Sequence, residues 1–253
     1  MGHKIQRFGW IPDLPDHRDH LYAAPLVNLG VLPPQVDLRP ACPPVYDQGQ
    51  LGSCTANAIA GAIQFDRMKE HKPNFVPSRL FIYYNERVIE GTVNTDSGAM
   101  IRDGIKSVAK QGDVPETEWP YDIAKFAEKP PQKVYNDAKK YKVIQYQRVS
   151  RNLIQMKGCL ASGYPFVFGF SVYESFESQQ VAQTGQVNMP GPNEQEIGGH
   201  AVLAVGYDDA QQRFIVRNSW GTDWGMAGYF TMPYTYLTDP NLSDDFWTIR
   251  LVL

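Results

Sequence analysis

The chain has 253 residues, 43% of them hydrophobic, and a formal net charge of −3. This length suffices for one large domain or two small lobes with ordinary cores. The slight negative charge lacks the basic footprint of a nucleic-acid-binding protein, and no apolar run approaches the roughly 20 residues that span a bilayer. Residues 1–7 lack the apolar core of a secretory signal, so the protein either stays inside the cell or had a signal removed.

Residues 1–33 are polar and rich in turns, and they predict an extended N-terminal arm ahead of a domain at 34–253. Several large side chains in this arm, Phe8, Trp10, Leu14 and Tyr22, could anchor it to the domain. Acidic and basic residues alternate over positions 13–20 without helical i, i+4 pairing. That pattern favours a solvated, salt-bridged turn over a metal site.

The first half of the domain predicts a mainly helical lobe at about 48–140. A nearly continuous apolar pattern predicts a central helix over 53–71. Further helices are expected over 79–89, with Ser78 as its cap, and over 101–111, stopped at Gly112. Prolines make the region of residues 118–131 irregular.

The second half predicts a β lobe at about 141–253, and the whole chain an α+β fold with a cleft between its lobes. A short helix is expected over 152–161 and a long loop over 179–198. Asp208 begins the turn of a hairpin. The expected strands cover residues 143–146, 165–172, 200–207, 213–220, 228–232 and 246–250.

Three cysteines, Cys42, Cys54 and Cys159, give an odd count. They form no CxxC pair and no Cys/His cluster at zinc spacing, so we expect no metal and no cofactor. If Cys54 is a reactive thiol, Cys42 and Cys159 remain either as a disulfide or as two unpaired, small apolar residues.

Cys54 follows a glycine-containing turn, residues 47–53, and starts the central helix. The exposed N–H groups and the helix dipole favour a thiolate at such a position, which suits a nucleophile. Taken alone, a cysteine at a helix start is more often just a small N-terminal residue. The partners elsewhere in the sequence decide between these interpretations.

Three runs stand in one order along the chain: Asp47 to Cys54, Gly198 to Val202, and Asn218 to Gly221. In order and local sequence they resemble the papain-like cysteine peptidases, over most of the chain from about Pro34 to Leu253. The resemblance implies a helical lobe, an antiparallel β-barrel-like lobe and an active-site cleft between them. It also implies a cysteine endopeptidase that acts on peptides or proteins without a cofactor, and we expect a monomer.

The resemblance assigns Cys54 as the nucleophile and His200 as its partner in a thiolate–imidazolium pair. Asn218 would orient the imidazole, and Trp220 would cover their hydrogen bond from water. Gln48 and the Cys54 backbone N–H would stabilise the oxyanion on the way to an acyl-enzyme thioester. Each of these residues taken alone has an ordinary structural explanation. Chance is a poor explanation for all of them occurring together in this order and in these local sequences.

Departures from the family pattern concern control rather than chemistry. Leu51 stands where eukaryotic members usually have a disulfide cysteine, and Thr55 replaces the usual aromatic residue after the nucleophile. No long inhibitory prosegment precedes the domain, which suggests the bacterial or archaeal branch of the family. We hypothesise that residues 7–32 pack on the surface and partly cover the cleft, the alternative being a purely structural arm.

Substrate contacts are suggested by weaker matches. Ser97 and Gly98 resemble the loop that pairs with substrate backbone like an added strand, although Ser97 departs from a glycine. Gly199 resembles the opposite wall of the cleft. Counting back from Phe246 places Asp244 or Asp245 near the base of the pocket for the substrate side chain two positions before the cut. The alternative for either acid is a solvent-facing loop residue.

Two other functions remain open from the sequence. One is a different thiol chemistry on the same fold, such as an amidase, a transferase or a peptidoglycan hydrolase. The other is a catalytically silent peptide-binding module, against which the intact set of Cys54, His200, Asn218 and Gln48 argues. A redox sensor would need a resolving cysteine, and none lies near Cys54 in sequence.

Overall fold

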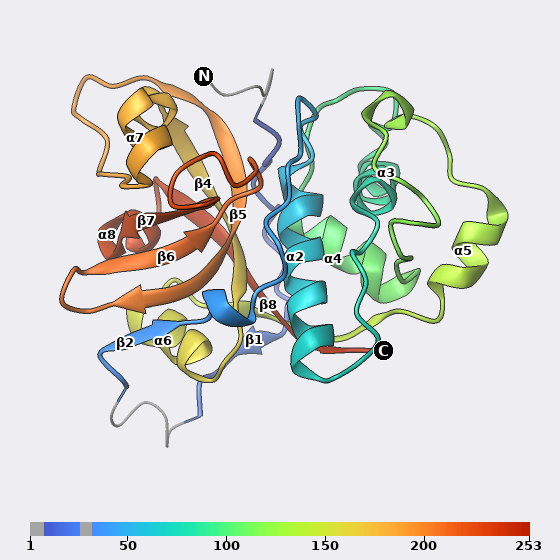
Figure 1. Ribbon diagram of the computed structural model, residues 1–253, viewed down its shortest axis with the longest axis horizontal. Helices are drawn as coiled ribbons and strands as arrows, with labels where there is room; N and C mark the ends of the chain where they lie inside the picture. The colour runs from blue at the N-terminus through green and yellow to red at the C-terminus, as the bar shows by residue number, and fades with distance from the viewer. Residues whose placement is uncertain (1–7, 26–31) are drawn as a thin grey trace.

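A computed structural model describes residues 8–25 and 32–253. It has two lobes side by side, one helical and one built on a sheet, with helix α2 at their junction (Figure 1). The larger helices of the helical lobe are α2 (Cys54–Lys69), α3 (Arg79–Glu90), α4 (Ile101–Lys110) and α5 (Gln132–Ala138). The sequence therefore predicted the α+β class and the two-lobe arrangement correctly.

Helix α2 is buried over almost its whole length because its residues are apolar around most of the circumference, as expected. It packs on α3 and α4 on one side and on strand β5 (Glu196–Asp208) on the other. The helix thus carries Cys54, its first residue, to the boundary between the lobes.

The β lobe contains one eight-stranded sheet that is open and mixed rather than barrel-like and antiparallel throughout. Its strand order is β1-β3-β8-β4-β5-β6-β7, with β2 also paired to β5. Strand β1, which belongs to the N-terminal arm, pairs in parallel with β3. Besides β5, the strands are β1 (Leu21–Tyr22), β2 (Gln35–Asp37), β3 (Val143–Val149), β4 (Phe166–Tyr173), β6 (Arg213–Arg217), β7 (Tyr229–Pro233) and β8 (Ser243–Val252).

Several short helices complete the fold, and of those in the described residues only α6 had been predicted. Helix α7 (Gln179–Thr184) interrupts the expected loop of residues 179–198; the Ser178 hydroxyl caps it and Gly185 ends it in a left-handed conformation. Helix α5 follows Pro131 directly. The remainder are α6 (Leu153–Ala161), α8 (Tyr234–Thr238), and the single-turn helices η1 (Arg39–Ala41), η2 (Ile123–Lys125) and η3 (Glu174–Glu177).

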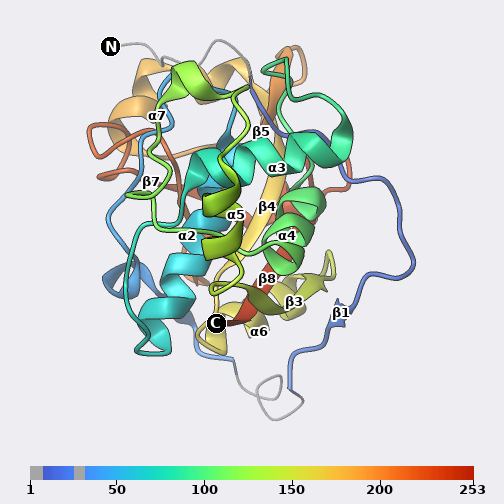
Figure 2. The ribbon, with the colours of Figure 1, turned by 90° about the vertical axis from the view of Figure 1, so that its right-hand side faces the viewer.

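The N-terminal arm passes between the loop at Ala99 and strand β5 and then runs along the outside of the molecule to β1 (Figures 1 and 2). Its polar turn is salt-bridged, as predicted: Arg18 pairs with Asp16 at 2.7 Å and Arg102 of α4 pairs with Asp19 at 2.5 Å. Tyr22 is buried next to β3. Residues 1–7 and 26–31, part of the predicted arm, lie outside the described residues.

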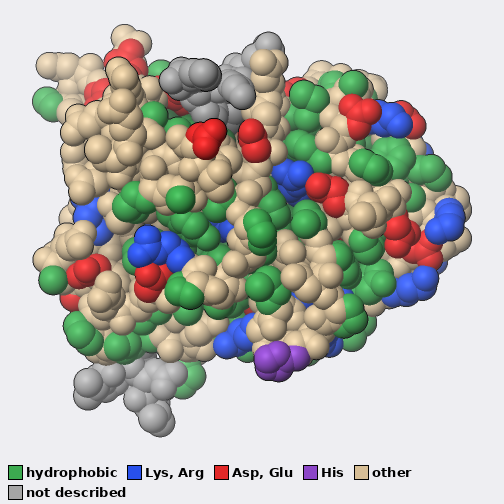
Figure 3. Space-filling model, viewed as in Figure 1, with side chains coloured by type: hydrophobic (Ala, Val, Ile, Leu, Met, Phe, Trp, Pro, Cys, Tyr) green, Lys and Arg blue, Asp and Glu red, His purple; other side chains and the backbone are tan. Residues whose placement is uncertain are grey.

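All three cysteines are free thiols, so Cys42 and Cys159 form no disulfide here. Within residues 8–25 and 32–253, no helix is long and apolar enough to cross a bilayer. Side chains of both charges are interspersed on the face shown in Figure 3.

Candidate active site

Cys54 lies at the N-terminus of α2, where the preceding loop is tied to the β lobe. The Gln48 N–H donates to the Ser219 carbonyl at 2.9 Å, and Gly49 makes the turn with φ of 61°. The sulfur of Cys54 accepts from the Ala201 N–H at 3.4 Å. The thiol is therefore held against strand β5, one residue beyond His200.

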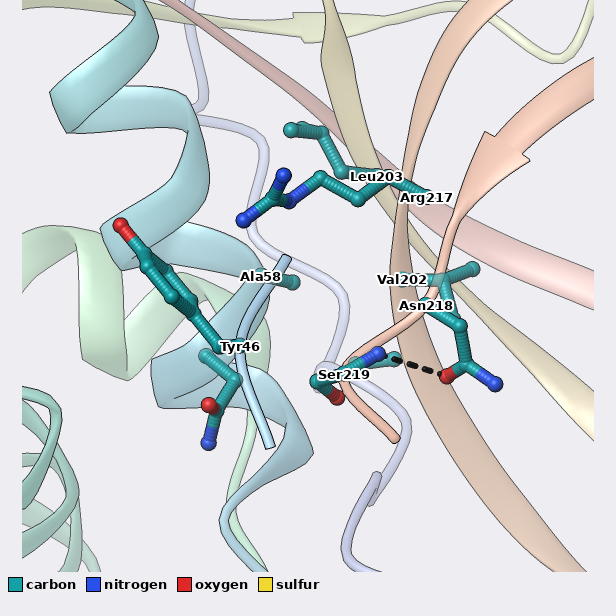
Figure 4. Close-up of a pocket in the computed structure, with 9 residues that line it drawn as sticks. Tyr46, Ala58, Val202, Leu203, Arg217, Asn218 and Ser219 are labelled. Carbon is teal, nitrogen blue, oxygen red and sulfur yellow. Dashed lines mark hydrogen bonds between the residues drawn. The ribbon is translucent and has the colours of Figure 1, made fainter. Parts of the chain in front are cut away.

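His200, in β5, and Asn218, which directly follows the neighbouring strand β6, form a direct hydrogen bond. The distance from His200 Nε2 to Asn218 Oδ1 is 2.8 Å. The Ser219 N–H also donates to Asn218 Oδ1, at 2.9 Å (Figure 4), which identifies this atom as the amide oxygen. Because an oxygen accepts, Nε2 carries the hydrogen, and Nδ1 is the nitrogen that can exchange a proton with a thiol.

Aromatic side chains enclose this imidazole. The Trp220 ring lies 4.9 Å from the His200 ring at an interplanar angle of 32°, which matches the expected cover. Phe170 and Phe176 lie 5.8 and 6.3 Å away, and His200 is completely buried. Next to the site, Arg217 extends past Leu203 toward Tyr46 (Figure 4). These residues line a cavity of about 10 Å³, close to the smallest volume that holds one water molecule.

The Gln48 side chain is fully buried and has a fixed orientation. Its carbonyl oxygen accepts from the Ser219 hydroxyl at 2.6 Å, and its Nε2 donates to the Leu51 carbonyl at 2.9 Å. An amide nitrogen has two hydrogens, and Leu51 takes one. The structure thus brings Gln48, Cys54, His200 and Asn218 into one contiguous cluster.

The arm occupies the cleft beside Cys54. Trp10 N–H donates to the Gly199 carbonyl at 2.9 Å, Ala99 N–H donates to the Gly9 carbonyl at 2.7 Å, and Ile11 N–H donates to the Ala99 carbonyl at 3.0 Å. A Cβ on Gly98, whose φ is +77°, would collide with the backbone of Gly9. The Gly98 and Gly199 walls proposed for a substrate therefore both contact the arm.

Two aromatic side chains flank Gly9 on opposite sides. Phe8 lies edge-on to His200 with ring centroids 6.1 Å apart and packs against Gly198. Trp10 covers Gly169 and Gly199, where any Cβ would overlap its ring. Gly169 was not singled out from the sequence, since a single glycine within a buried strand carries no functional signal.

Asp245, rather than Asp244, faces the Trp10 side chain. Trp10 Nε1 donates to Asp245 Oδ2 at 3.0 Å, and the Asp245 side chain is 1% exposed. The Asp244 side chain is 43% exposed and pairs with Arg151 at 2.7 Å and with Arg148 at 3.1 Å. The sequence could not separate the two because β8 changes register against β4 here and Asp245 has φ of 59°.

Ser97 lies beside this site rather than in it. It is half-buried, and its hydroxyl lies 3.4 Å from the carbonyl oxygen of Gly98. Gly98 itself is buried and its N–H donates to the Tyr83 hydroxyl at 3.3 Å. At this point the arm therefore meets the backbone of Gly98 and Ala99 rather than the Ser97 side chain.

Burial shifts the titration of three groups under the arm. Burial raises the pKa of Cys54 to about 12, although the N–H groups of Ala201 and Gly9 lower it. Burial also raises the pKa of Asp245 to about 7, with the charge of Asp13 next in importance. Asp13, whose pKa burial likewise raises, accepts from Trp247 Nε1 at 2.9 Å. With the arm in place, these environments favour the neutral thiol and weaken the acidity of both carboxyls.

Such a cluster, a helix-start cysteine against a strand histidine that an amide orients, defines a thiol enzyme of the papain type. Comparisons with known proteins agree. The family model for papain family cysteine proteases matches residues 32–239. An uncharacterized peptidase C1-like protein of Acanthamoeba polyphaga mimivirus is 47% identical over 272 residues, which cover 98% of this chain and 88% of that one.

Solved structures extend the agreement to the whole chain. Xylellain, a cysteine protease from Xylella fastidiosa, is 49% identical with a TM-score of 0.92, over 99% of this chain and 98% of that one. A procathepsin B from Trypanosoma congolense, 19% identical, shares the fold with a TM-score of 0.74 over 94% of this chain and 84% of that chain. This chain belongs to the papain family of cysteine proteases.

Proposed function

We propose that this chain is a cysteine endopeptidase in which Cys54 attacks the peptide carbonyl and the N-terminal arm restrains that activity. The observation that carries the proposal is the placement of the Cys54 sulfur on the Ala201 N–H, next to an imidazole that Asn218 orients. This arrangement serves acyl transfer in which one ring nitrogen moves a proton between sulfur and leaving group.

Each step balances with the groups present. His200 Nδ1 takes the thiol proton, the sulfur adds to the carbonyl carbon, and the C–N bond breaks as the imidazolium protonates the departing amine. Water then adds to the thioester and gives a proton to His200, and the C–S bond breaks. The products are a carboxylic acid, an amine and the regenerated thiol.

Gln48 supports the charged intermediates. We assign its second amide hydrogen, together with the Cys54 backbone N–H, to the oxyanion of both tetrahedral intermediates. The hydrogen bonds to Ser219 and Leu51 hold the amide in one orientation before substrate arrives. Donors fixed in advance cost no reorganisation during the reaction, and each is typically worth about 10²–10³ in rate.

The arm fits the role of a built-in restraint. Gly9 places its N–H by the sulfur of Cys54, while its carbonyl bonds to the Ala99 N–H. Because the Phe8–Gly9 peptide bond is trans, its N–H faces the sulfur while its carbonyl oxygen points the opposite way, which would explain how the arm occupies the cleft uncut. It also excludes water, which disfavours the thiolate.

The pocket that Trp10 fills suggests a substrate preference. An apolar side chain with a hydrogen-bond donor at its tip could replace the indole and reach Asp245. Arg148 lies 2.9 Å from Asp245 and offsets its charge, so we expect acceptance of basic side chains rather than a requirement for them. The likeness to xylellain, from a bacterium, supports the bacterial branch.

The test of this function is covalent labelling and hydrolysis by the full chain. An epoxysuccinyl peptide should label the protein once and stop its cleavage of a denatured protein substrate. Both reactions should vanish in Cys54→Ala and persist in Cys159→Ala, because Cys159 is a buried thiol with no link to His200 in its recorded contacts. Cleavage that survives Cys54→Ala, or labelling without any cleavage, would refute the proposal.

A further inference from the structure

Asp96 links the two loops that form the helical side of the cleft. Both of its carboxylate oxygens lie 3.1 Å from the Gly52 N–H. A Cβ on Gly52 would lie 3.0 Å from Asp96 Oδ1, so any larger residue would crowd this carboxylate. Asp96 stands in the loop between α3 and α4, and Gly52 lies two residues before Cys54.

The Gly52 N–H belongs to the same peptide group as the Leu51 carbonyl. That carbonyl accepts from Gln48 Nε2 at 2.9 Å. The Leu51–Gly52 peptide plane is thus held at its N–H by Asp96 and at its oxygen by Gln48. A peptide group is rigid and planar, so an acceptor that fixes its N–H also fixes the direction of its carbonyl. Asp96 thereby sets the position of the acceptor that orients the Gln48 amide.

A second branch leads from Asp96 to the substrate wall. The Tyr83 hydroxyl donates to Asp96 Oδ1 at 2.5 Å and accepts from the Gly98 N–H at 3.3 Å. Tyr83 is completely buried, and burial and the neighbouring Asp96 charge raise its pKa, so the hydroxyl keeps its proton. Through Tyr83, the same carboxylate holds Gly98 in its left-handed conformation at the cleft.

Arg87 supports this arrangement from below. Its guanidinium lies 3.9 Å from the centre of the Tyr83 ring. Its Nη1 donates to the carbonyls of Val93 at 2.7 Å and Thr95 at 3.2 Å. The loop that carries Asp96 is therefore fixed by its own backbone, and the carboxylate has a defined position from which to reach Gly52.

We propose that Asp96 is a positioning residue that takes the place of the disulfide missing at Leu51, holding the Cys54 loop and the Gly98 wall together. The inference rests on the proposed peptidase function. A covalent bridge would fix the distance between the loops, whereas the carboxylate also fixes the orientation of one peptide group. Unlike a disulfide, this link is insensitive to reducing agents.

The two branches predict different kinetic effects. Asp96→Ala should lower kcat about tenfold or more, because the Gln48 amide loses its fixed acceptor. Asp96→Asn should recover most of that loss, since its amide oxygen still accepts from the Gly52 N–H. Tyr83→Phe should chiefly raise KM, because it releases Gly98 while the Asp96 carboxylate keeps its bond to the Gly52 N–H. Asp122→Ala is the matched control. Asp122 is an exposed loop acid on the same lobe, and its carboxylate accepts a hydrogen bond from the nearby Ala124 N–H.

A double-mutant cycle with Gln48→Ala gives the decisive readout. If Asp96 acts through Gln48, removing both should cost little more than removing Gln48 alone. Variants should be compared in the full chain carrying Trp10→Ala, per active site titrated with the epoxysuccinyl peptide. A parent without Cys54-dependent cleavage refutes the peptidase function itself. An active parent in which Asp96→Ala lowers only Tm, or in which the two losses multiply, overturns the role of Asp96.

Discussion

The two sides of the cleft are built on different principles. On one side, which we name the β wall, His200 and Asn218 lie on or next to regular strands, and the rings of Phe170, Phe176 and Trp220 surround the imidazole. The other side, the helical wall, consists of the loops of residues 48–53 and 92–98. Hydrogen bonds rather than packed rings hold these loops in place.

This difference sets how each wall should respond to mutation. A ring removed from the β wall leaves a cavity, but the strand hydrogen bonds and the other rings still fix His200. A single acceptor removed from the helical wall frees a peptide group, while little apolar surface is exposed. We therefore expect the β wall to lose stability before activity, and the helical wall to lose activity before stability.

The largest contrast should come from Gln48→Ala and Phe176→Leu. Gln48→Ala removes an oxyanion donor and should lower kcat by about 10²–10³. Phe176→Leu removes part of a buried ring, so it should cost about 1–2 kcal/mol of stability while kcat per titrated site stays within about threefold. Steady-state kinetics and thermal unfolding of both variants measure the two effects.

Gln64→Ala controls for loss of a buried glutamine, since Gln64 bonds only to Tyr46 and Asn74 in its recorded contacts. A Gln48→Ala enzyme with normal kcat would remove the amide from the mechanism. A large fall in kcat for Phe176→Leu would show that packing, rather than strand geometry, positions His200.

The β wall was largely predictable from the sequence, and the helical wall was not. Strand patterns predicted neighbouring strands over 200–207 and 213–220, and the resemblance to the papain-like peptidases singled out His200 and Asn218 within them. In the structure β6 ends at Arg217, so Asn218 follows its strand directly. The central helix was predictable because its apolar surface is nearly continuous. Short helices such as α7 depend on one cap and one buried residue, which is too little pattern to detect.

Contacts between distant loops had no signal in the sequence. Asp96 precedes the Ser97–Gly98 match to the family's substrate loop, but nothing in that match indicates its partner Gly52, which is 44 residues away. The choice between Asp244 and Asp245 depended on a register change in β8 that residue counting cannot anticipate. The sequence suggested an arm that partly covers the cleft, but not that Phe8 and Trp10 enter it where glycines at 169, 198 and 199 leave room for their rings.

The arm contacts both walls, so a variant that weakens its docking tests how strongly the two walls together bind it. Trp10→Ala should raise kcat/KM of the full chain by about 30-fold, because burial of a large side chain contributes roughly 2 kcal/mol to docking. Leu14→Ala, at an arm position that is 67% exposed, should change nothing. Equal kcat/KM for the wild type and Trp10→Ala would mean that the arm does not limit access.

Arm docking should also depend on pH, through acids that meet at the β wall. Docking raises the pKa of Asp245 to about 7 and raises that of Asp13, so the docked state binds protons more tightly than the free state. Docking should therefore be firmest below about pH 4, the ordinary range for a carboxyl pKa, and weaken progressively as pH rises through 7, by about tenfold between pH 6 and pH 8. The ratio of kcat/KM for the wild type to that for Trp10→Ala isolates this effect from the ionisation of the catalytic groups.

That ratio should rise with pH for the wild-type arm. In an Asp13→Asn background the rise should be smaller, because Asp245 loses the repulsion of one facing acid while burial, the larger cause of its raised pKa, remains. Asp244 and Arg148 also face Asp245, and both remain in this variant. A ratio that falls with pH would contradict the sign of the linkage.

The smallest effect concerns the pocket that Trp10 vacates. Asp245→Asn should lower kcat/KM for an Arg-Arg substrate relative to a Phe-Arg substrate by about fivefold, because Arg148 already offsets much of the charge. Asp244→Asn is the matched change on the exposed neighbour and should leave the ratio unaltered. If Asp244→Asn alone shifts the preference, the exposed Asp244 binds the substrate side chain and the buried Asp245 binds only the arm. If neither does, both acids belong to the ion-pair network that holds β3 to β8, and the specificity of the β wall comes from its shape.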